Sequence, residues 1–242
     1  MTSIENAMVL AAGRGVRLGA LTTTRPKPLV DLGGTTPLDL VLDRLAAAGV
    51  KAVTINTHHL AEQIAEHLAG RTSPAITLSP EETLLETGGG VRRALPTLGE
   101  GPFYTVNADV VWDDGYEPAL RRLAAAWDDA RMDALLLLHP TARAVGYEGL
   151  GDFQCDPLGS LRRRKEGEVV PFLHTGVQIL HPRLFEDTPE GPFSLNLLYD
   201  RAIEAGRLWG IVHDGDWLDI GTPDRLEAAR RQYGDHRQGR LL

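Results

Sequence analysis

Four cationic side chains stand close together in a glycine-containing segment near the start of the chain. The segment reads Leu10-Ala11-Ala12-Gly13-Arg14-Gly15-Val16-Arg17, and Arg25 and Lys27 follow it. Small residues let the backbone turn sharply and bring its N–H groups close to a ligand, where successive N–H groups form an anion-binding concavity. With four cations beside it, such a loop suits a triphosphate.

Two known phosphate-binding motifs do not account for this segment. The P-loop pattern Gly-x-x-x-x-Gly-Lys-Ser/Thr is absent, and in the dinucleotide-binding pattern Leu18 stands where the third glycine belongs. The required helix cannot follow, because Thr22-Thr23-Thr24 is β-branched and Pro26 and Pro28 exclude helical continuation. We expect these prolines to hold Lys27 on a stiff, extended segment.

The elements around the loop alternate between strands and helices. The apolar run 7–10 is typical of a strand buried on both faces of a sheet, and 52–56 is a second predicted strand. Between them, Thr36 and Pro37 begin an amphipathic helix that ends at Gly49. This βαβ unit predicts an α/β fold with a doubly wound sheet.

Two aspartates stand where such a sheet would bind a ligand. The strand that begins at Phe103 ends in Asn107-Ala108-Asp109, and Asp219 is flanked by apolar residues at strand-like spacing. Ligands bind beyond the carboxyl ends of strands, and Mg²⁺ on a triphosphate takes one or two carboxylates. The Asn-x-Asp pattern is equally typical of an ordinary turn. A carboxylate at position 219 is costly unless it is paired or binds a metal.

These residues resemble a known signature. Ala-Ala-Gly-x-Gly-x-Arg at 11–17, Leu-Thr at 21–22 and Pro-Lys-Pro-Leu at 26–29 are similar to the motif of the sugar-1-phosphate nucleotidylyltransferases. The resemblance implies a Rossmann-like, doubly wound mixed sheet of the nucleotidyltransferase (GT-A-like) type. It implies an enzyme that transfers a nucleotidyl group from a nucleoside triphosphate to a sugar 1-phosphate and releases pyrophosphate. It also implies that Asp109 and Asp219, the latter within Trp-x-Asp-x-Gly-Thr, bind Mg²⁺.

The same resemblance suggests roles for individual residues. Arg17 and Lys27 are the expected catalytic residues, Arg17 on the β- and γ-phosphates and Lys27 on the α-phosphate and the incoming sugar phosphate. Nucleotide binding is assigned to Leu10, Ala11, Ala12, Gly13, Arg14, Gly15, Arg17, Leu85 and Gly88. Sugar binding is assigned to Asn107, Thr175 and Gly176.

The base is expected to lie against Gly88-Gly89-Gly90, because three adjacent glycines at a helix start are costly to order. Main-chain pairing at Gly88 would suit uracil; the alternative is a helix N-terminus that needs close packing. Within the family, the compact length and Leu85–Gly90 look most like the N-acetylmuramate α-1-phosphate uridylyltransferases of cell-wall (peptidoglycan) recycling. Mannose-1-phosphate guanylyltransferases are the alternative, with Glu81 or Glu82 accepting from guanine. Expected substrates are therefore UTP, or GTP, and a sugar 1-phosphate.

From Gly149 onward the pattern changes to short strands and turns. We expect a small additional β-sheet over the acceptor site at about 149–180, within a single domain spanning 1–242. The basic run 162–165 is either a solvated hairpin edge or a site for an acidic acceptor sugar. Many relatives place a Glu-Lys-Pro lysine near here, and because that element is absent neither Arg164 nor Lys165 inherits its role.

Composition and charge argue against several classes of ligand and location. A net charge of −8 argues against a nucleic-acid or anionic-membrane surface, and Cys155, the only cysteine, permits no intramolecular disulfide. With no secretory signal pattern, we expect a cytoplasmic protein, and no protein partner is implied. Zinc at His58 and His59 is disfavoured because His-Glu-x-x-His is missing. A catalytically silent sugar-nucleotide sensor is a further alternative, against which the combination of Lys27, Asp109 and Asp219 argues.

Overall fold

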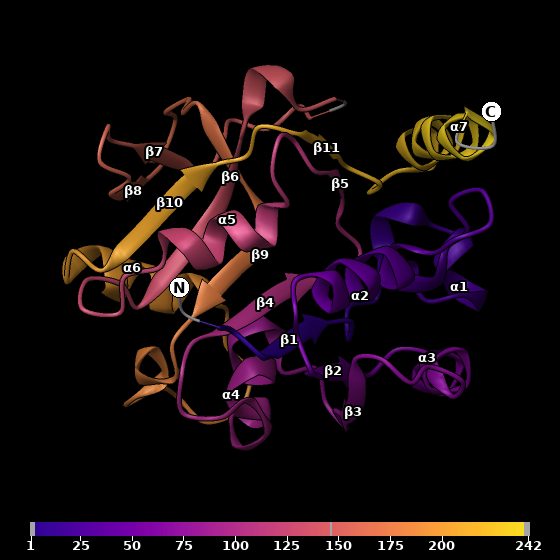
Figure 1. The fold of residues 1–242 in the computed structure, drawn as a ribbon, viewed down its shortest axis with the longest axis horizontal. Coiled ribbons are helices and arrows are strands. Elements are labelled where there is room, and N and C mark those ends of the chain that lie inside the picture. Colours follow the sequence, from indigo (N-terminus) through magenta and orange to yellow (C-terminus); the bar gives the residue numbers. More distant parts are fainter. Residues whose placement is uncertain (1–2, 146, 240–242) are drawn as a thin grey trace.

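One mixed sheet organises the part of the chain that this computed structural model describes, residues 3–145 and 147–239, with side chains up to 231. Within it, seven strands follow the order β3-β2-β1-β4-β9-β6-β10 (Figure 1). They are β1 (Asn6–Leu10), β2 (Ala52–Thr57), β3 (Ala75–Pro80), β4 (Phe103–Asn107), β6 (Ala134–Pro140), β9 (Phe172–Leu180) and β10 (Leu208–Val212). Strand β9 is antiparallel to both neighbours, whereas β1 to β4 are parallel to one another and β6 is parallel to β10.

Helices cover both faces of this sheet, which confirms the predicted α/β doubly wound fold. One core lies between the sheet and α2 (Pro37–Ala47), α3 (Ala61–Leu68) and α5 (Ala119–Ala126). The opposite core includes α4 (Glu86–Leu98) and α6 (Asn196–Glu204). The side chains of strand β1 alternate between the two faces of the sheet. Ala7 and Val9 pack into the first core and Met8 packs into the second, and all three are fully buried.

The region expected to form a separate sheet is instead joined to the main one. Strand β7 (Phe153–Cys155) pairs with β8 (Leu161–Arg163) and, through Phe153 and Phe172, with β9. The small second sheet is formed by β5 (Val111–Asp113) and β11 (Asp216–Leu218), which are antiparallel. The sequence pattern predicted short strands within 149–180 but not their partners, because pairing depends on distant segments.

The segment after β1 departs from the expected extended backbone. It contains a 3₁₀ turn (Val16–Leu18), a single helical turn α1 (Leu21–Thr24) and a second 3₁₀ turn (Lys27–Leu29). Pro26 is extended, but Lys27 already begins the second 3₁₀ turn, in which Leu29 N–H donates to the Pro26 carbonyl at 2.9 Å. The extended conformation expected for Lys27 is therefore wrong: Pro28 fits because the first residues of a turn need no N–H donor. Other 3₁₀ turns span Thr141–Arg143 and Pro182–Phe185.

A third, smaller core ties this segment to the end of the chain. It is formed by Leu18, Val30, Leu32, Val111, Leu218, Ile220, Leu226 and Ala229. The core thus packs the loop, the β5–β11 ribbon and α7 (Pro223–Gly239) together (Figure 1). Trp217 Nε1 also donates to the Thr175 carbonyl at 3.2 Å. These contacts fix the backbone on either side of Asp219.

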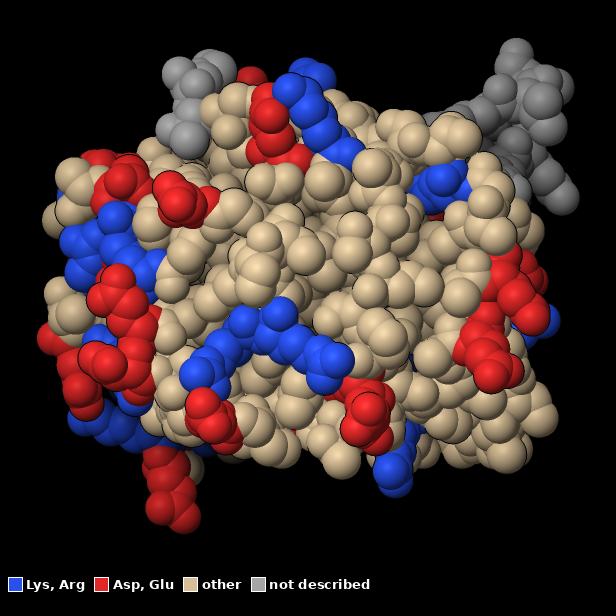
Figure 2. All heavy atoms as spheres, turned by 90° about the horizontal axis from the view of Figure 1, so that it is seen from below, with Lys and Arg blue, Asp and Glu red and all other residues tan. Residues whose placement is uncertain are grey.

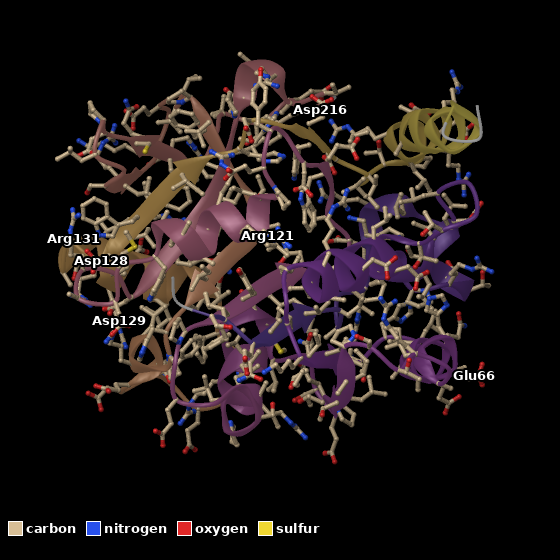
Figure 3. The ribbon with its side chains drawn as sticks, in the orientation of Figure 1. Glu66, Arg121, Asp128, Asp129, Arg131 and Asp216 are labelled. Carbon is tan, nitrogen blue, oxygen red and sulfur yellow. The ribbon has the colours of Figure 1, made fainter. Side chains whose placement is uncertain are left out.

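Charged side chains serve mainly to join surface segments. Arg183 Nε and Arg207 Nε lie 2.7 and 2.9 Å from Asp133 Oδ1, beside the N-terminal end of β6. Figure 3 shows Asp128, Asp129 and Arg131 near this end, away from Asp216 on β11. On the face seen in Figure 2, charges of both signs are interspersed around a broad uncharged area. Among the described residues, no helix combines the length and apolar character needed to cross a bilayer.

Buried histidines make the stability of this fold pH-dependent. His139 and His213 are fully buried with ring centroids 5.9 Å apart, and desolvation lowers the pKa of both. Below pH 6.5 the unfolded chain therefore binds protons at these two histidines more readily than the native state does. We expect the free energy of unfolding to fall as the pH drops below 6.5, by at most about 1.4 kcal/mol per pH unit for each such histidine.

Urea unfolding at about pH 7.5 and about pH 5.5 would measure this effect. His139→Phe removes one titrating group while keeping a ring of similar size, so its stability should depend less on pH than that of the unmodified chain. Equal pH dependence in the two proteins would contradict the expectation for His139.

Candidate active site

A cleft of about 400 Å³ opens at the carboxyl ends of β1 and β4. Its lining comprises Leu10, Ala11, Ala12, Gly13, Gly15, Lys27, Pro28, Asn56, Leu84, Glu86, Thr87, Asn107, Asp109 and Ser194. A second cavity of about 240 Å³ continues from it and is lined by Gly15, Val16, Arg17, Lys27, Asp109 and Gly221. Because Gly15, Lys27 and Asp109 line both cavities, they stand at the junction between them.

The predicted loop forms one wall of the cleft. Gly15 has φ +62°, and a Cβ there would lie 3.0 Å from Lys27 Cβ and Thr22 Cγ2, so a larger residue would be both strained and crowded. Thr22 Oγ1 donates to the Gly15 carbonyl at 3.1 Å, and this hydrogen bond stabilises the turn. Arg14, expected to bind nucleotide, is exposed and is not among the residues that line the cleft.

A buried hydrogen-bond network fixes the loop to the other wall. Asn56 Oδ1 accepts from Ala11 N–H at 2.8 Å, and Asn56 Nδ2 donates to Glu81 Oε1 at 2.7 Å. Glu81 Oε2 accepts from Leu85 N–H at 2.9 Å, just before α4 begins. Sequence reasoning missed the role of Asn56; an Asn at the end of a predicted parallel strand, opposite the loop, was the available signal.

This network changes the interpretation of Glu81. Its side chain is 5% exposed and both of its oxygens have protein partners. This arrangement does not favour Glu81 as an acceptor for guanine, because both of its oxygens are engaged by the protein and Glu81 is not among the residues that line the cleft. Glu82 is exposed and does not line the cleft.

Lys27 and Asp109 meet at the junction of the two cavities, Arg17 lines the second cavity, and Asp219 is not among the lining residues of either. Lys27 is 8% exposed, and its Nζ lies 2.6 Å from Asp109 Oδ2. Asp219 Oδ1 accepts from Gly221 N–H at 2.7 Å, while Asp219 Oδ2 pairs with Arg225 in the first turn of α7. A Cβ on Gly221 would lie 3.2 Å from the Arg17 guanidinium, so Arg17 lies against this same corner.

Arg225 is a residue that the sequence patterns did not single out. Two structural features account for its position: α7 begins at Pro223, and the chain turns through Gly221 immediately after Asp219. The guanidinium therefore folds back onto the carboxylate six residues earlier. Both aspartates of the predicted metal site are thus neutralised by a cation in this structure.

The residues assigned to the sugar are only partly available. Asn107 lines the cleft, and Gly176, with φ +85°, brings the β9 backbone against it; a Cβ on Gly176 would lie 2.7 Å from Asn107 Nδ2. Thr175 is buried, and its hydroxyl donates to the Leu137 carbonyl at 2.8 Å. Among the three, the Thr175 side chain is therefore committed to holding β9 on β6.

The glycines at the start of α4 pack tightly. Gly88 N–H and Gly89 N–H donate to the Phe193 carbonyl at 2.8 and 3.1 Å. Leu85 and Gly88 are not among the residues that line the cleft, whereas Leu84, Glu86 and Thr87 are, and Glu86 has a left-handed backbone with φ 59°. This geometry favours close packing as the reason for the glycines, because the Gly88 N–H is not free to pair with a base.

Gly88→Ala is expected to lower the free energy of unfolding by about 1–3 kcal/mol, the usual cost of overpacking. A Cβ there would lie 2.8 Å from the Phe193 carbonyl oxygen and closer still to its ring. Urea unfolding measures the loss, and Gly70→Ala, which meets nothing within 4 Å, is the matched control. Equal stability of the two variants would contradict the packing explanation.

Comparison with known proteins identifies the family of this chain. A family described as the MobA-like NTP transferase domain matches residues 7–238. The chain is 40% identical to the N-acetylmuramate alpha-1-phosphate uridylyltransferase of Caulobacter vibrioides, covering 95% of this chain and 97% of the relative. It is 34% identical to the enzyme of the same name from Neisseria meningitidis serogroup B, covering 94% and 98%.

More distant proteins are also similar to this chain. The mannose-1-phosphate guanylyltransferase catalytic subunit beta of Danio rerio is 27% identical over 90% of this chain and 61% of the relative. The crystal structure of a UDP-glucose pyrophosphorylase complexed with UDP-glucose superposes with a TM-score of 0.79 at 15% identity, covering 96% and 99%. The chain belongs to the MobA-like NTP transferase family and is a nucleotidyltransferase of the sugar-1-phosphate nucleotidylyltransferase group, as its loop and its two aspartates predict.

Proposed function

We propose that this enzyme transfers the uridylyl group of UTP to N-acetylmuramate α-1-phosphate, releasing pyrophosphate and forming a UDP-sugar for peptidoglycan recycling. The observation that carries the proposal is the convergence of Lys27, Arg17 and Asp109 on two connected cavities beside the glycine loop. The two N-acetylmuramate alpha-1-phosphate uridylyltransferases that match nearly the whole chain support this choice of base and sugar.

The reaction needs no general base, because the attacking sugar phosphate is already ionised. Catalysis is then alignment and charge stabilisation, which typically contribute several kcal/mol each. The loop N–H groups and Arg17 hold the β- and γ-phosphates, and Lys27 stabilises negative charge on the α-phosphate. Lys27 suits this role because it is buried and its Nζ is held at the cavity junction by Asp109.

The donor set fits a divalent cation. Asp109 and Asp219 offer the carboxylate oxygens that Mg²⁺ prefers, and we assign both as its ligands. When bound, Mg²⁺ would neutralise phosphate charge at the reacting centre. No group of three or more His, Cys, Asp and Glu side chains is placed to hold a metal within the described residues, so phosphate oxygens would complete the ligand set.

The guanylyltransferase alternative loses its main structural argument. It relied on Glu81 or Glu82 as acceptors for guanine, and Glu81 is instead bonded to Asn56 and Leu85. Uracil needs no acidic acceptor.

Pyrophosphate release tests the proposal directly. The purified protein is incubated with Mg²⁺ and either UTP or GTP, against N-acetylmuramate α-1-phosphate, mannose 1-phosphate or glucose 1-phosphate. UTP with the muramate sugar should give the highest rate. GTP with mannose 1-phosphate as the preferred pair would establish the guanylyltransferase, and no pyrophosphate from any pair would favour a silent sensor.

A further inference from the structure

Arg225 is a charged side chain beside the active site to which the chemistry derived above gives no role. It lies in the first turn of α7 and pairs through Nη1 with Asp219 Oδ2. The pair is partly buried, because the Arg225 side chain is 21% exposed and the Asp219 side chain 14%. Water and salt screen such a pair less than a surface pair, so the guanidinium holds the carboxylate firmly.

The two aspartates of the proposed metal site are paired with cations in different positions. Asp109 and its partner Lys27 both line the cleft and the second cavity, and we assign Lys27 to the α-phosphate. Asp219 and its partner Arg225 are not among the lining residues of either of these cavities. The Arg225 charge therefore serves the Asp219 carboxylate and not a phosphate in the two cavities.

Both oxygens of Asp219 have a partner in the protein. Oδ1 accepts from Gly221 N–H at 2.7 Å, and Oδ2 accepts from Arg225. A divalent cation bound by Asp219 needs one of these oxygens to face it. The Gly221 N–H is fixed by the backbone turn, whereas the guanidinium is at the end of a flexible side chain. Arg225 is therefore the partner that can be exchanged.

A second carboxylate lies close to Arg225. Arg225 Nη2 is 4.0 Å from Glu148 Oε2, on a side chain that is 92% exposed. Release from Asp219 would thus leave the guanidinium beside another acceptor at the protein surface. A divalent cation at Asp219 would favour this release, because like charges repel strongly at short range.

We infer that Arg225 is a positioning residue that competes with the divalent cation for Asp219. This competition rests on the proposed function, in which Asp219 is a metal ligand, and adds to it a control of metal affinity. While Arg225 is paired, Asp219 Oδ2 is not available to the metal. The apparent dissociation constant of the metal is then the intrinsic value divided by the fraction of molecules in which the pair is open.

Binding of Mn²⁺ without nucleotide, measured from the electron paramagnetic resonance signal of the free ion, tests the competition. Arg225→Gln removes the charge and keeps a polar side chain. It should lower the dissociation constant of Mn²⁺ about 10-fold, because a hydrogen bond between charged groups no longer has to be broken.

Arg231→Gln is the matched control, because it makes the same change of charge on the same helix. The Arg231 side chain is 77% exposed and lies 3.9 Å from Glu227. This variant should bind Mn²⁺ as the unmodified protein does.

Thermal unfolding gives a second readout that is independent of turnover. In EDTA, Arg225→Gln should have a lower Tm than the unmodified protein, because Asp219 is left without its counter-ion. The same concentration of Mg²⁺ should then raise the Tm more in the variant, because stabilisation by a ligand grows as its dissociation constant falls. If Arg225→Gln does not fold, Arg225→Lys, which keeps the charge without the fork, should bind Mn²⁺ more tightly than the unmodified protein but by less than 10-fold.

A dissociation constant that is unchanged or higher in the Arg225 variants would overturn the competition. An arginine that only holds Asp219 in place for the metal would give this result, because its loss would weaken binding. Asp219→Asn separates the competition from the proposed function. If Asp219→Asn weakens Mn²⁺ binding and the Arg225 variants do not strengthen it, the metal assignment stands and the competition falls. If Asp219→Asn leaves Mn²⁺ binding unchanged, Asp219 is not a ligand and both fall.

Discussion

Asp219→Asn and Asp109→Asn should each lower Mg²⁺-dependent turnover by about 10³-fold while leaving the fold intact. Several kcal/mol of charge stabilisation would be lost with a metal ligand, and about 1.4 kcal/mol corresponds to each tenfold change in rate. Asparagine keeps the shape and an oxygen that can still accept the Gly221 N–H, so the loss would be one of charge rather than of packing.

Initial rates over a range of Mg²⁺ concentrations measure this effect, and urea unfolding checks the fold. Asp216→Asn is the matched control: it lies three residues before Asp219, and its side chain is 67% exposed, 3.9 Å from Arg143. Unchanged turnover in either active-site variant would show that the corresponding aspartate does not bind the metal.

Lys27→Ala is expected to lower kcat about 10²- to 10³-fold with a smaller change in KM for the nucleotide. A cation placed where charge develops in the transition state acts mainly on kcat, and removing one such group typically has this magnitude. Lys27 lies beside Gly15, where an added Cβ would come within 3.0 Å of the Lys27 Cβ, and its Nζ lies 2.6 Å from Asp109 Oδ2.

Steady-state kinetics that separate kcat from KM decide the role of Lys27. Lys51→Ala offers a comparison, because Lys51 is 71% exposed and pairs with Glu5 on the surface. A change confined to the nucleotide KM in Lys27→Ala would mean that the lysine binds the ground state only.

The sequence predicted the features that depend on local pattern. Strand β1, the capped helix α2 and the parallel strand β2 follow from hydrophobic period and from Thr36, whose side chain accepts from Asp39 N–H. The glycine loop and Asp109 are also local, because they come directly after buried strands and therefore reach the carboxyl edge of the sheet.

Features that depend on distant segments could not be predicted in this way. The sequence pattern places Glu81 in a loop, but in the structure Glu81 is buried and accepts hydrogen bonds from Asn56, 25 residues earlier, and from Leu85 N–H. In the sequence Thr175 is a polar residue beside a glycine, which suggested sugar binding. In the structure its hydroxyl donates a hydrogen bond to the Leu137 carbonyl. Arg164 is indistinguishable from its basic neighbours until their partners are known.

The position of β9 has a consequence for how the molecule is made. Residues 172–180 pair with β4 on one side and β6 on the other, so until this late segment has left the ribosome β4 has only β1 beside it and β6 has no neighbour in the sheet. Until then the β4 edge is open to pairing with other chains. The loop and Asp109 can form on the early strands, whereas His174 and Gly176 arrive with β9. During synthesis the loop and Asp109 thus emerge before Gly176, and Ser194 of the cleft and Asp219 emerge last.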